Sequence, residues 1–278
     1  MIAITRRDRS FSAVDPGEIL VKETRIPAGD IEINAKLLLP RGVIDANGDP
    51  LERLPVVIFH HGYGDNIDKG NLLPYAAAIA VGFPCAALLY DCRGHGKSPG
   101  SKLQYNRTLN DVQRVIAFAG QLAAVDTTRI GFMGISLGGT IALLRAYPDA
   151  RVKAVVGVSC LDAMPLDFSK NPATASGRLA RWFMRVTGIL RQMQDEGPDP
   201  PSIQGFPPGT DDVTLVQRLF LVHAKDDKFV KFSKFLELRD RLHVPQEQCL
   251  VLESGGHDTR GREREVVDAV LAFLKARL

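Results

Sequence analysis

The sequence predicts an α/β fold in which eight strands form a doubly wound, mostly parallel sheet with one insertion. Three observations support this prediction. Six continuous apolar runs have the character of strands that are covered on both faces, and helical patterns lie between several of them. Two runs with alternating side chains precede them and predict an antiparallel start.

The antiparallel start is expected at residues 18–28 and 31–39, where apolar and polar side chains alternate. Gly29 and Asp30 lie between these runs, which fits a hairpin with a tight turn. The later runs are continuously apolar, and because both faces of a parallel strand are covered, this character predicts parallel pairing. They are expected at residues 55–61, 84–91, 129–135, 152–160, 218–224 and 248–254.

Helical patterns occupy several of the intervals between strands. Residues 71–81 end at a glycine and residues 137–146 end before a proline, and both are helix stop signals. Thr108 and Asp111 are expected to cap a third helix, and residues 262–278 place apolar side chains on one side of a fourth.

One interval is too long for a simple crossover. Residues 161–217 separate the sixth strand from the seventh, and within them "SGRLARWFMRVTGILRQMQDEG" (176–197) has the spacing of an amphipathic helix. No stretch suggests a second independent core, so residues 1–278 are expected to form a single domain with this insertion.

The composition excludes several classes of function. Hydrophobic residues make up 45% and charged residues 24% of the chain, and a net charge of +3 is too small to indicate nucleic acid or an anionic membrane as a partner. The N-terminal stretch lacks the apolar core of an export signal, and no segment approaches the roughly 20 apolar residues of a membrane span. We therefore expect a cytoplasmic protein.

The stretch "GFMGISLGG" (131–139) contains the pattern G-x-S-x-G around Ser136, directly after a predicted strand. In this pattern a sharp turn presents the central side chain, and the glycines avoid collisions with strand and helix. Glycine-rich turns between strand and helix also bind phosphates through backbone N–H groups. The motif alone therefore leaves a nucleophile and a structural turn open.

A second glycine-rich loop, "FHHGYGDN" (59–66), ends an earlier predicted strand. An oxyanion needs two N–H donors held in place, and those of Tyr63 and Leu137 are the candidates. His60 and His61 should point to opposite faces of the strand, one in the core and one bracing the loop, which makes them poor joint metal ligands. We expect no metal site.

A reactive serine also needs a base and an orienting acid. "HAKDDKFV" (223–230) and "ESGGHDTRG" (253–261) each follow a predicted strand, which places them with Ser136 at the carboxyl edge of the sheet. With the order Ser, Asp, His, residues 18–278 resemble the α/β-hydrolase-fold serine hydrolases of the carboxylesterase, acylglycerol lipase and serine aminopeptidase type. "YDCRGHGKSPG" (90–100) matches another segment of that family, which usually braces loops beside the site.

The resemblance assigns roles to individual residues. The family's D-x-x-V ending selects Asp227 as the acid, with Asp226 as a solvent or loop-capping carboxylate and Asp162 as an alternative acid after strand six. His257 follows two glycines and is expected as the base, whereas His95 lies in the bracing segment. A serine–histidine–aspartate triad of this kind works through an acyl-enzyme and requires no cofactor.

In the family, an insertion after strand six forms a cap over the site, so the resemblance implies that residues 161–217 are a small helical cap. Trp182, Phe183 and Val186 within it either cover the core or line an apolar acyl pocket. The arginines on another side of the same helix form a solvated face, attract a substrate carboxylate or phosphate, or make a subunit contact in a homodimer.

The expected activity is hydrolysis of small-molecule carboxylic esters with small to medium acyl chains. Two alternatives stay open: a serine peptidase or amidase of the same fold, and a catalytically silent hydrolase fold that binds a ligand. All three residue types of a triad are present, which argues against the silent fold.

Overall fold

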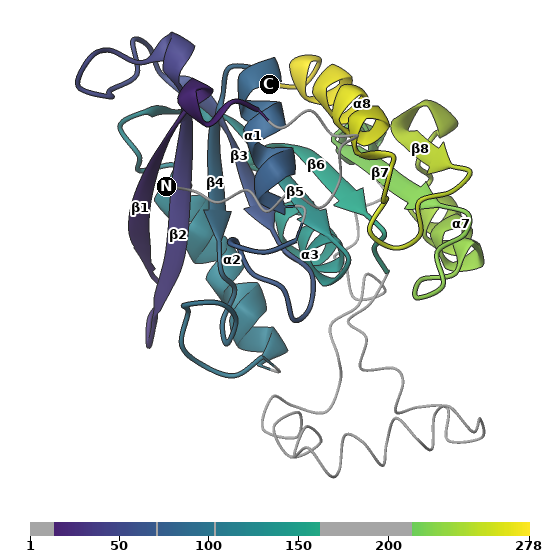
Figure 1. The fold of residues 1–278 in the computed structure, drawn as a ribbon. Helices are drawn as coiled ribbons and strands as arrows, with labels where there is room; N and C mark the ends of the chain where they lie inside the picture. Colours follow the sequence, from purple (N-terminus) through teal and green to yellow (C-terminus); the bar gives the residue numbers. More distant parts are fainter. Residues whose placement is uncertain (1–13, 71, 103, 162–212) are drawn as a thin grey trace.

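The computed structural model describes residues 14–70, 72–102, 104–161 and 213–278. One eight-stranded sheet with the order β1-β2-β4-β3-β5-β6-β7-β8 runs through its centre (Figure 1). The strands are β1 (Ile19–Pro27), β2 (Glu32–Pro40), β3 (Leu54–His60), β4 (Ala86–Tyr90), β5 (Val125–Ile135), β6 (Val152–Val158), β7 (Leu219–Ala224) and β8 (Cys249–Leu252). The predicted eight-stranded, mostly parallel sheet is therefore confirmed.

The hairpin of β1 and β2 turns at Gly29 and Asp30, as the sequence predicts. Pro27 pairs with Glu32, and the Ala28 N–H donates to the Ile31 carbonyl at 2.9 Å across the turn. Gly29 has a φ of 78°, a left-handed value that favours glycine. β2 then pairs antiparallel with β4, and every later pair in the sheet is parallel. The carboxyl ends of β3 to β8 consequently lie at one edge.

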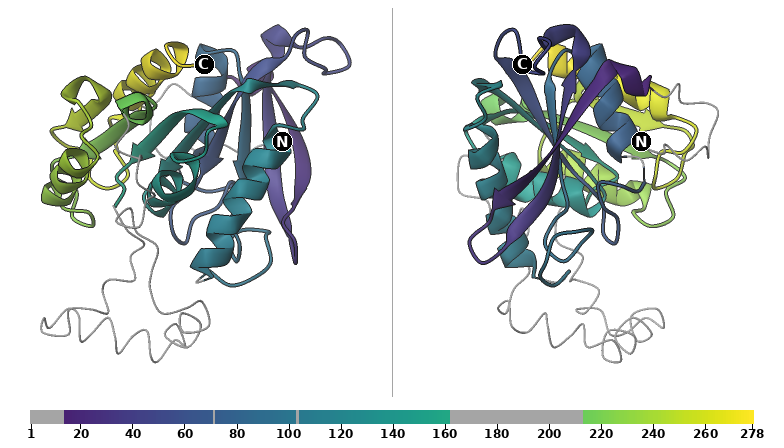
Figure 2. Two further views of the ribbon diagram at one scale, coloured as in Figure 1. Left: turned by 180° about the vertical axis from the view of Figure 1, so that it is seen from behind. Right: turned by 60° about the vertical axis from the view of Figure 1, so that its left-hand side comes forward.

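Helices cover both faces of this sheet, as a doubly wound fold requires. α1 (Leu72–Gly82) and α8 (Glu263–Lys275) pack on one face, where they share a buried apolar cluster with the strands. α2 (Tyr105–Ala119), α3 (Leu137–Ile141) and α7 (Phe232–Arg241) pack on the other. Figure 2 shows the two layers from behind and the twist of the sheet from the side.

Shorter helical segments complete the described chain. They are η1 (Pro16–Glu18), η2 (Arg41–Val43), the π-helical turn η3 (Ala142–Ala146), α6 (Val213–Val216) and η6 (Gln246–Gln248). The helix predicted over residues 137–146 is thus α-helical only in its first half.

Two helix predictions differ from the structure. α2 begins at Tyr105, and Thr108 and Asp111 are buried inside it rather than capping its start. The Asp111 carboxylate pairs instead with the Arg93 guanidinium. The sequence pattern does not predict α7, because only two side chains of this short polar helix are buried.

The predicted cap falls mostly on residues 162–212, which lie outside the described residues, so the cap stays a prediction. In the ranges that are described, no helix has the length and apolar character needed to cross a membrane.

Candidate active site

Ser136 lies between β5 and α3, with a φ of 56° and a ψ of −119°. This strained conformation is characteristic of a nucleophile on a sharp strand-to-helix turn. A Cβ on Gly134 would lie 2.0 Å from the Gly138 carbonyl oxygen, and a Cβ on Gly138 would lie 2.3 Å from the His60 carbonyl oxygen. Both obstacles are backbone atoms, so the glycines of the G-x-S-x-G pattern are required for the turn.

The His257 imidazole connects Ser136 to Asp227. Its Nε2 lies 2.8 Å from the Ser136 Oγ, and its Nδ1 lies 2.8 Å from the Asp227 Oδ2. An ionised carboxylate only accepts hydrogen bonds, so the Nδ1–H donates to Asp227 and Nε2 accepts from the serine hydroxyl. This tautomer has the geometry of a general base acting on the serine oxygen.

The Asp227 carboxylate is buried just beyond the end of β7. Its Oδ1 accepts the backbone N–H of Phe229 at 2.8 Å and that of Val230 at 3.0 Å. Burial favours a raised pKa, but the hydrogen bonds from the His257 ring and from the backbone outweigh it and hold the pKa of Asp227 below its ordinary value. Asp227 is therefore ionised at neutral pH and is able to stabilise a protonated His257.

Asp226, the neighbouring carboxylate, contacts the backbone of the loop that carries His257. It accepts the Gly256 N–H at 2.8 Å and the Gly255 N–H at 3.3 Å. This geometry fits the loop-capping role that the sequence suggests for Asp226. The third candidate acid, Asp162, lies outside the described residues, as do Trp182, Phe183 and Val186.

Two backbone N–H groups lie beside Ser136. Leu137 is the first residue of α3, where helix N–H groups have no acceptor within the helix. Gly62 lies so close that a Cβ there would be 3.4 Å from the Ser136 Cβ, and Tyr63 follows it in the chain. Among the residues that the structure describes, neither the Tyr63 nor the Leu137 N–H donates to a protein acceptor. Both remain available to a substrate oxygen.

His61 fixes the peptide that carries the Tyr63 N–H. The Cys92 N–H donates to the His61 Nε2 at 3.0 Å, so the proton of the neutral ring is on Nδ1, which donates to the Gly62 carbonyl at 2.8 Å. That carbonyl and the Tyr63 N–H belong to one planar trans peptide and point in opposite directions. Burial lowers the pKa of His61 to about 4, which keeps this arrangement neutral and intact at physiological pH.

The loop after β4, which contains Cys92, is itself held in place by buried hydrogen bonds. Within it, the Arg93 guanidinium is buried and donates to the Asp111 carboxylate at 2.8 Å and to the Asp30 carboxylate at 2.8 Å. The His95 Nδ1 lies 3.0 Å from the Arg93 carbonyl oxygen and 3.1 Å from the Cys92 Sγ. His95 therefore has the place of a bracing residue and makes no contact with Ser136 within the described chain.

Two further residues lie beside His257 and Asp227, and neither of them has a role in the site that the sequence predicts. The Phe229 side chain is 83% exposed, with its ring centroid 5.3 Å from that of His257. His223 is buried in β7, and its Nε2 lies 2.9 Å from the Val230 carbonyl oxygen and 3.9 Å from the Asp227 Oδ2. Their nearness to Asp227 in the sequence is the signal that could have found them.

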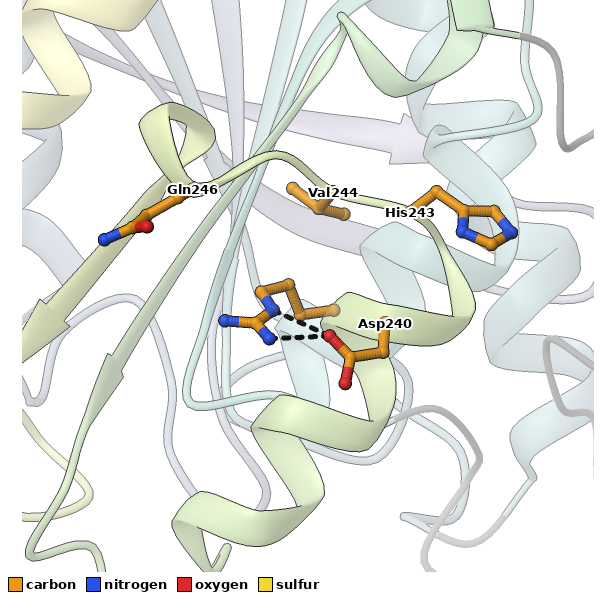
Figure 3. A pocket seen from close by; sticks show the side chains of 5 residues that line it. Asp240, His243, Val244 and Gln246 are labelled. Atoms are coloured by element: carbon orange, nitrogen blue, oxygen red, sulfur yellow. Dashed lines mark hydrogen bonds and ion pairs between the residues drawn. The ribbon is translucent and has the colours of Figure 1, made fainter.

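A hollow of about 540 Å³ lies away from this site. Figure 3 shows the residues that line it, which belong to the end of α7 and to the segment before β8. Because this segment leads into the amino end of β8, the hollow lies at the edge of the sheet opposite to the carboxyl ends of the strands, where Ser136 and His257 lie. The lining residues are Arg239, Asp240, His243, Val244 and Gln246. The described part of the chain contains no group of three histidine, cysteine or acidic side chains arranged to hold a metal ion.

The family model described as the alpha/beta hydrolase family matches residues 57–269. The chain belongs to this family. The match spans every strand from the core of β3 to β8 and includes all the residues gathered around Ser136. The hydrolase resemblance deduced from the sequence is confirmed.

Curated relatives of this hydrolase match only part of the chain. Acyltransferase drtE of Aspergillus calidoustus is 31% identical over 133 residues, which cover 47% of this chain and 42% of the relative. Thiohydrolase aneE of Aspergillus aculeatus is 29% identical over 117 residues, which cover 41% of this chain and 34% of the relative. Each alignment thus spans less than half of the relative's length.

Solved structures with the same fold match nearly the whole chain. An acetyl xylan esterase from Paenibacillus sp. R4 superposes with a TM-score of 0.65 at 21% identity, covering 95% of this chain and 86% of that one. Est1E of Butyrivibrio proteoclasticus, solved with ferulic acid, gives 0.64 at 18% identity, covering 91% and 98%. At these identities the likeness establishes the fold alone.

Proposed function

We propose that this hydrolase cleaves carboxylic esters of small to medium acyl chains, with Ser136 as the nucleophile, His257 as the base and Asp227 as the acid. The observation that carries the proposal is the His257 ring, which lies 2.8 Å from both the Ser136 Oγ and the Asp227 Oδ2. The fold that the chain shares with an acetyl xylan esterase supports the choice of esters.

The proposed reaction proceeds in two halves. His257 Nε2 takes the hydroxyl proton as the Ser136 Oγ bonds to the acyl carbon, and the resulting oxyanion accepts the Tyr63 and Leu137 N–H groups. The intermediate then expels the alcohol, which takes the proton from Nε2, and leaves an acyl group on Ser136. Water attacks this acyl-enzyme in the same way and releases the acid.

A second candidate reaction uses the same acyl-enzyme with thioesters or with an acceptor other than water. It is favoured by the relatives named as a thiohydrolase and an acyltransferase. Thioesters deliver the same acyl group to Ser136, so the two candidates differ in leaving group and acceptor. Turnover of an oxygen ester and a thioester of one acyl chain, with and without an added alcohol, separates them.

The direct test is a series of p-nitrophenyl esters of increasing acyl length. We expect wild-type turnover with an optimum at short to medium chains, and a loss of at least about 1,000-fold in Ser136→Ala, because the remaining groups cannot form the acyl-enzyme. His243→Ala, in the distant hollow, serves as the matched control. Wild-type turnover in Ser136→Ala would refute the nucleophile assignment.

Two further probes address the remaining alternatives. A fluorophosphonate that labels Ser136 in the folded protein argues against a silent ligand-binding fold, and a failure to label argues for it. Faster turnover of aminoacyl amides than of matched esters would overturn the esterase proposal in favour of a peptidase or amidase.

A further inference from the structure

The loop that presents His257 contains two successive glycines. Gly255 and Gly256 precede the histidine, with φ values of 135° and 62° that favour glycine. Glycine loses more conformational freedom on folding than any other residue, so two in succession leave the position of the imidazole weakly defined by the chain itself. Contacts from outside the glycine pair must therefore fix it.

The far side of the loop is held by its own residues and by α1. The Arg260 N–H donates to the Gly255 carbonyl at 2.8 Å, and the buried Thr259 Oγ1 lies 2.7 Å from the Tyr75 hydroxyl. These contacts fix the chain after His257. None of these contacts provides an acceptor for the N–H groups of the two glycines before His257. A part of the chain outside the loop must provide these acceptors.

The Asp226 carboxylate supplies both acceptors. Its Oδ1 accepts the Gly256 N–H at 2.8 Å, and its Oδ2 accepts the Gly255 N–H at 3.3 Å. Successive N–H groups that converge in this way form a small anion-binding concavity. The hydrogen bond from Gly256 is the largest cause that holds the pKa of Asp226 below its ordinary value, so the anion persists at neutral pH.

The neighbouring residue completes the arrangement. Asp227 holds the His257 ring through Nδ1, while Asp226 holds the backbone one and two residues before it. Both carboxylates come from the turn after β7, which lies beside the loop between β8 and α8 (Figure 1). The two adjacent aspartates therefore hold His257 both by its ring and by the backbone that precedes it.

We infer that Asp226 is a positioning residue: as an anion bound by the Gly255 and Gly256 N–H groups, it sets the place of the His257 imidazole between Ser136 and Asp227. This inference rests on the proposed function, in which His257 is the base. It makes the aspartate pair after β7 a functional unit, of which only the second member touches the imidazole.

The test is Asp226→Ala, because it empties the concavity and leaves two unpaired N–H groups. We expect kcat for a p-nitrophenyl ester to fall about ten-fold with KM nearly unchanged, since the substrate does not touch residue 226. Formate is small enough to occupy the concavity, so sodium formate should restore several-fold of the lost kcat relative to sodium chloride at equal ionic strength. A loss of kcat that came from partial unfolding of the variant would not be restored by formate.

Two variants serve as controls. Asp240→Ala removes another exposed carboxylate, paired with Arg239 in the distant hollow, and should change neither kcat nor the formate response. Asp226→Asn keeps one acceptor oxygen at nearly the same size, so it should fold and give an intermediate kcat.

Three outcomes overturn the inference: a kcat of Asp226→Ala within two-fold of wild type, a loss that formate does not reduce, or wild-type kcat in Asp226→Asn if the alanine variant does not fold. The proposed function fails differently, through an inactive wild type or an active Ser136→Ala. If the wild type turns over no ester, the rate of fluorophosphonate labelling of Ser136 replaces kcat in the same comparison.

Discussion

The His61 ring makes two hydrogen bonds that orient the peptide carrying the Tyr63 N–H, and two substitutions at position 61 should each remove a different one. Asparagine at position 61 keeps an N–H at the place of Nδ1, which donates to the Gly62 carbonyl at 2.8 Å, but loses the acceptor for Cys92. Glutamine reaches the place of Nε2 and keeps the acceptor for Cys92, but loses the donor to Gly62. The two variants thus separate the two hydrogen bonds of one ring.

The structure also bounds the size of the effect. Complete loss of one oxyanion donor costs about 100-fold to 1,000-fold in kcat. The Gly62 carbonyl also accepts the Asp65 N–H at 3.3 Å, a longer bond that keeps part of the peptide's orientation. We therefore expect kcat to fall about 10-fold to 100-fold in His61→Gln and less than about three-fold in His61→Asn.

The assay compares kcat and KM for a p-nitrophenyl ester with the affinity for a trifluoromethyl ketone. The ketone forms an oxyanion on the serine, so its affinity should fall in parallel with kcat while KM changes little. His243→Gln, an exposed histidine in the distant hollow, is the control. The reasoning is refuted if His61→Gln keeps wild-type kcat and ketone affinity, or if His61→Asn is the more damaged variant.

Two further predictions concern stability. Asp111→Asn should lower the free energy of unfolding, measured by urea denaturation, by roughly 3 kcal/mol. The reason is that Arg93 stays buried with only the half-exposed Asp30 as its charged partner. A loss below about 1 kcal/mol would contradict this. Burial lowers the pKa of His60 to about 3 and of His61 to about 4, whereas unfolded histidines titrate near pH 6.5. The unfolded state therefore binds more protons between these values, and stability should be full above pH 6.5 and fall as the pH drops, by about 2 kcal/mol per ring at pH 5. Equal urea midpoints at pH 7 and pH 5 would contradict the pH prediction.

Strands were easier to predict than helices in this chain. Buried parallel strands have continuous apolar runs, a local property that is visible in the sequence, and all eight strands occur at or near their predicted places. The position of β4 between β2 and β3 depends on long-range pairing, which no local pattern encodes. The supposed capping pair in α2 failed for a related reason, since Asp111 pairs with Arg93, a residue 18 positions earlier in the chain.

The candidate site was predictable to the extent that its residues follow strand ends. Ser136, Asp227 and His257 each come after a parallel strand, so the carboxyl edge of the sheet brings them together. The orientation of the Gly62 peptide by His61 was not predictable, because it depends on a backbone N–H from the neighbouring loop at residue 92. The position of Phe229 two residues after Asp227 places it near the site, but the contact of its exposed ring with the His257 ring depends on how the loop after β8 folds.

The donor that holds His61 is the backbone N–H of Cys92 and not its thiol, so the hydrogen bond depends little on which side chain stands at position 92. A substitution of that side chain by another small residue leaves the donor in place, so the thiol itself is dispensable for setting the ring of His61. Proline has no N–H and would remove the donor at once. The buried position 92 should therefore accept other small side chains but not proline, and Cys92→Pro would test the hydrogen bond to His61 without changing His61 or the loop at residues 62–64.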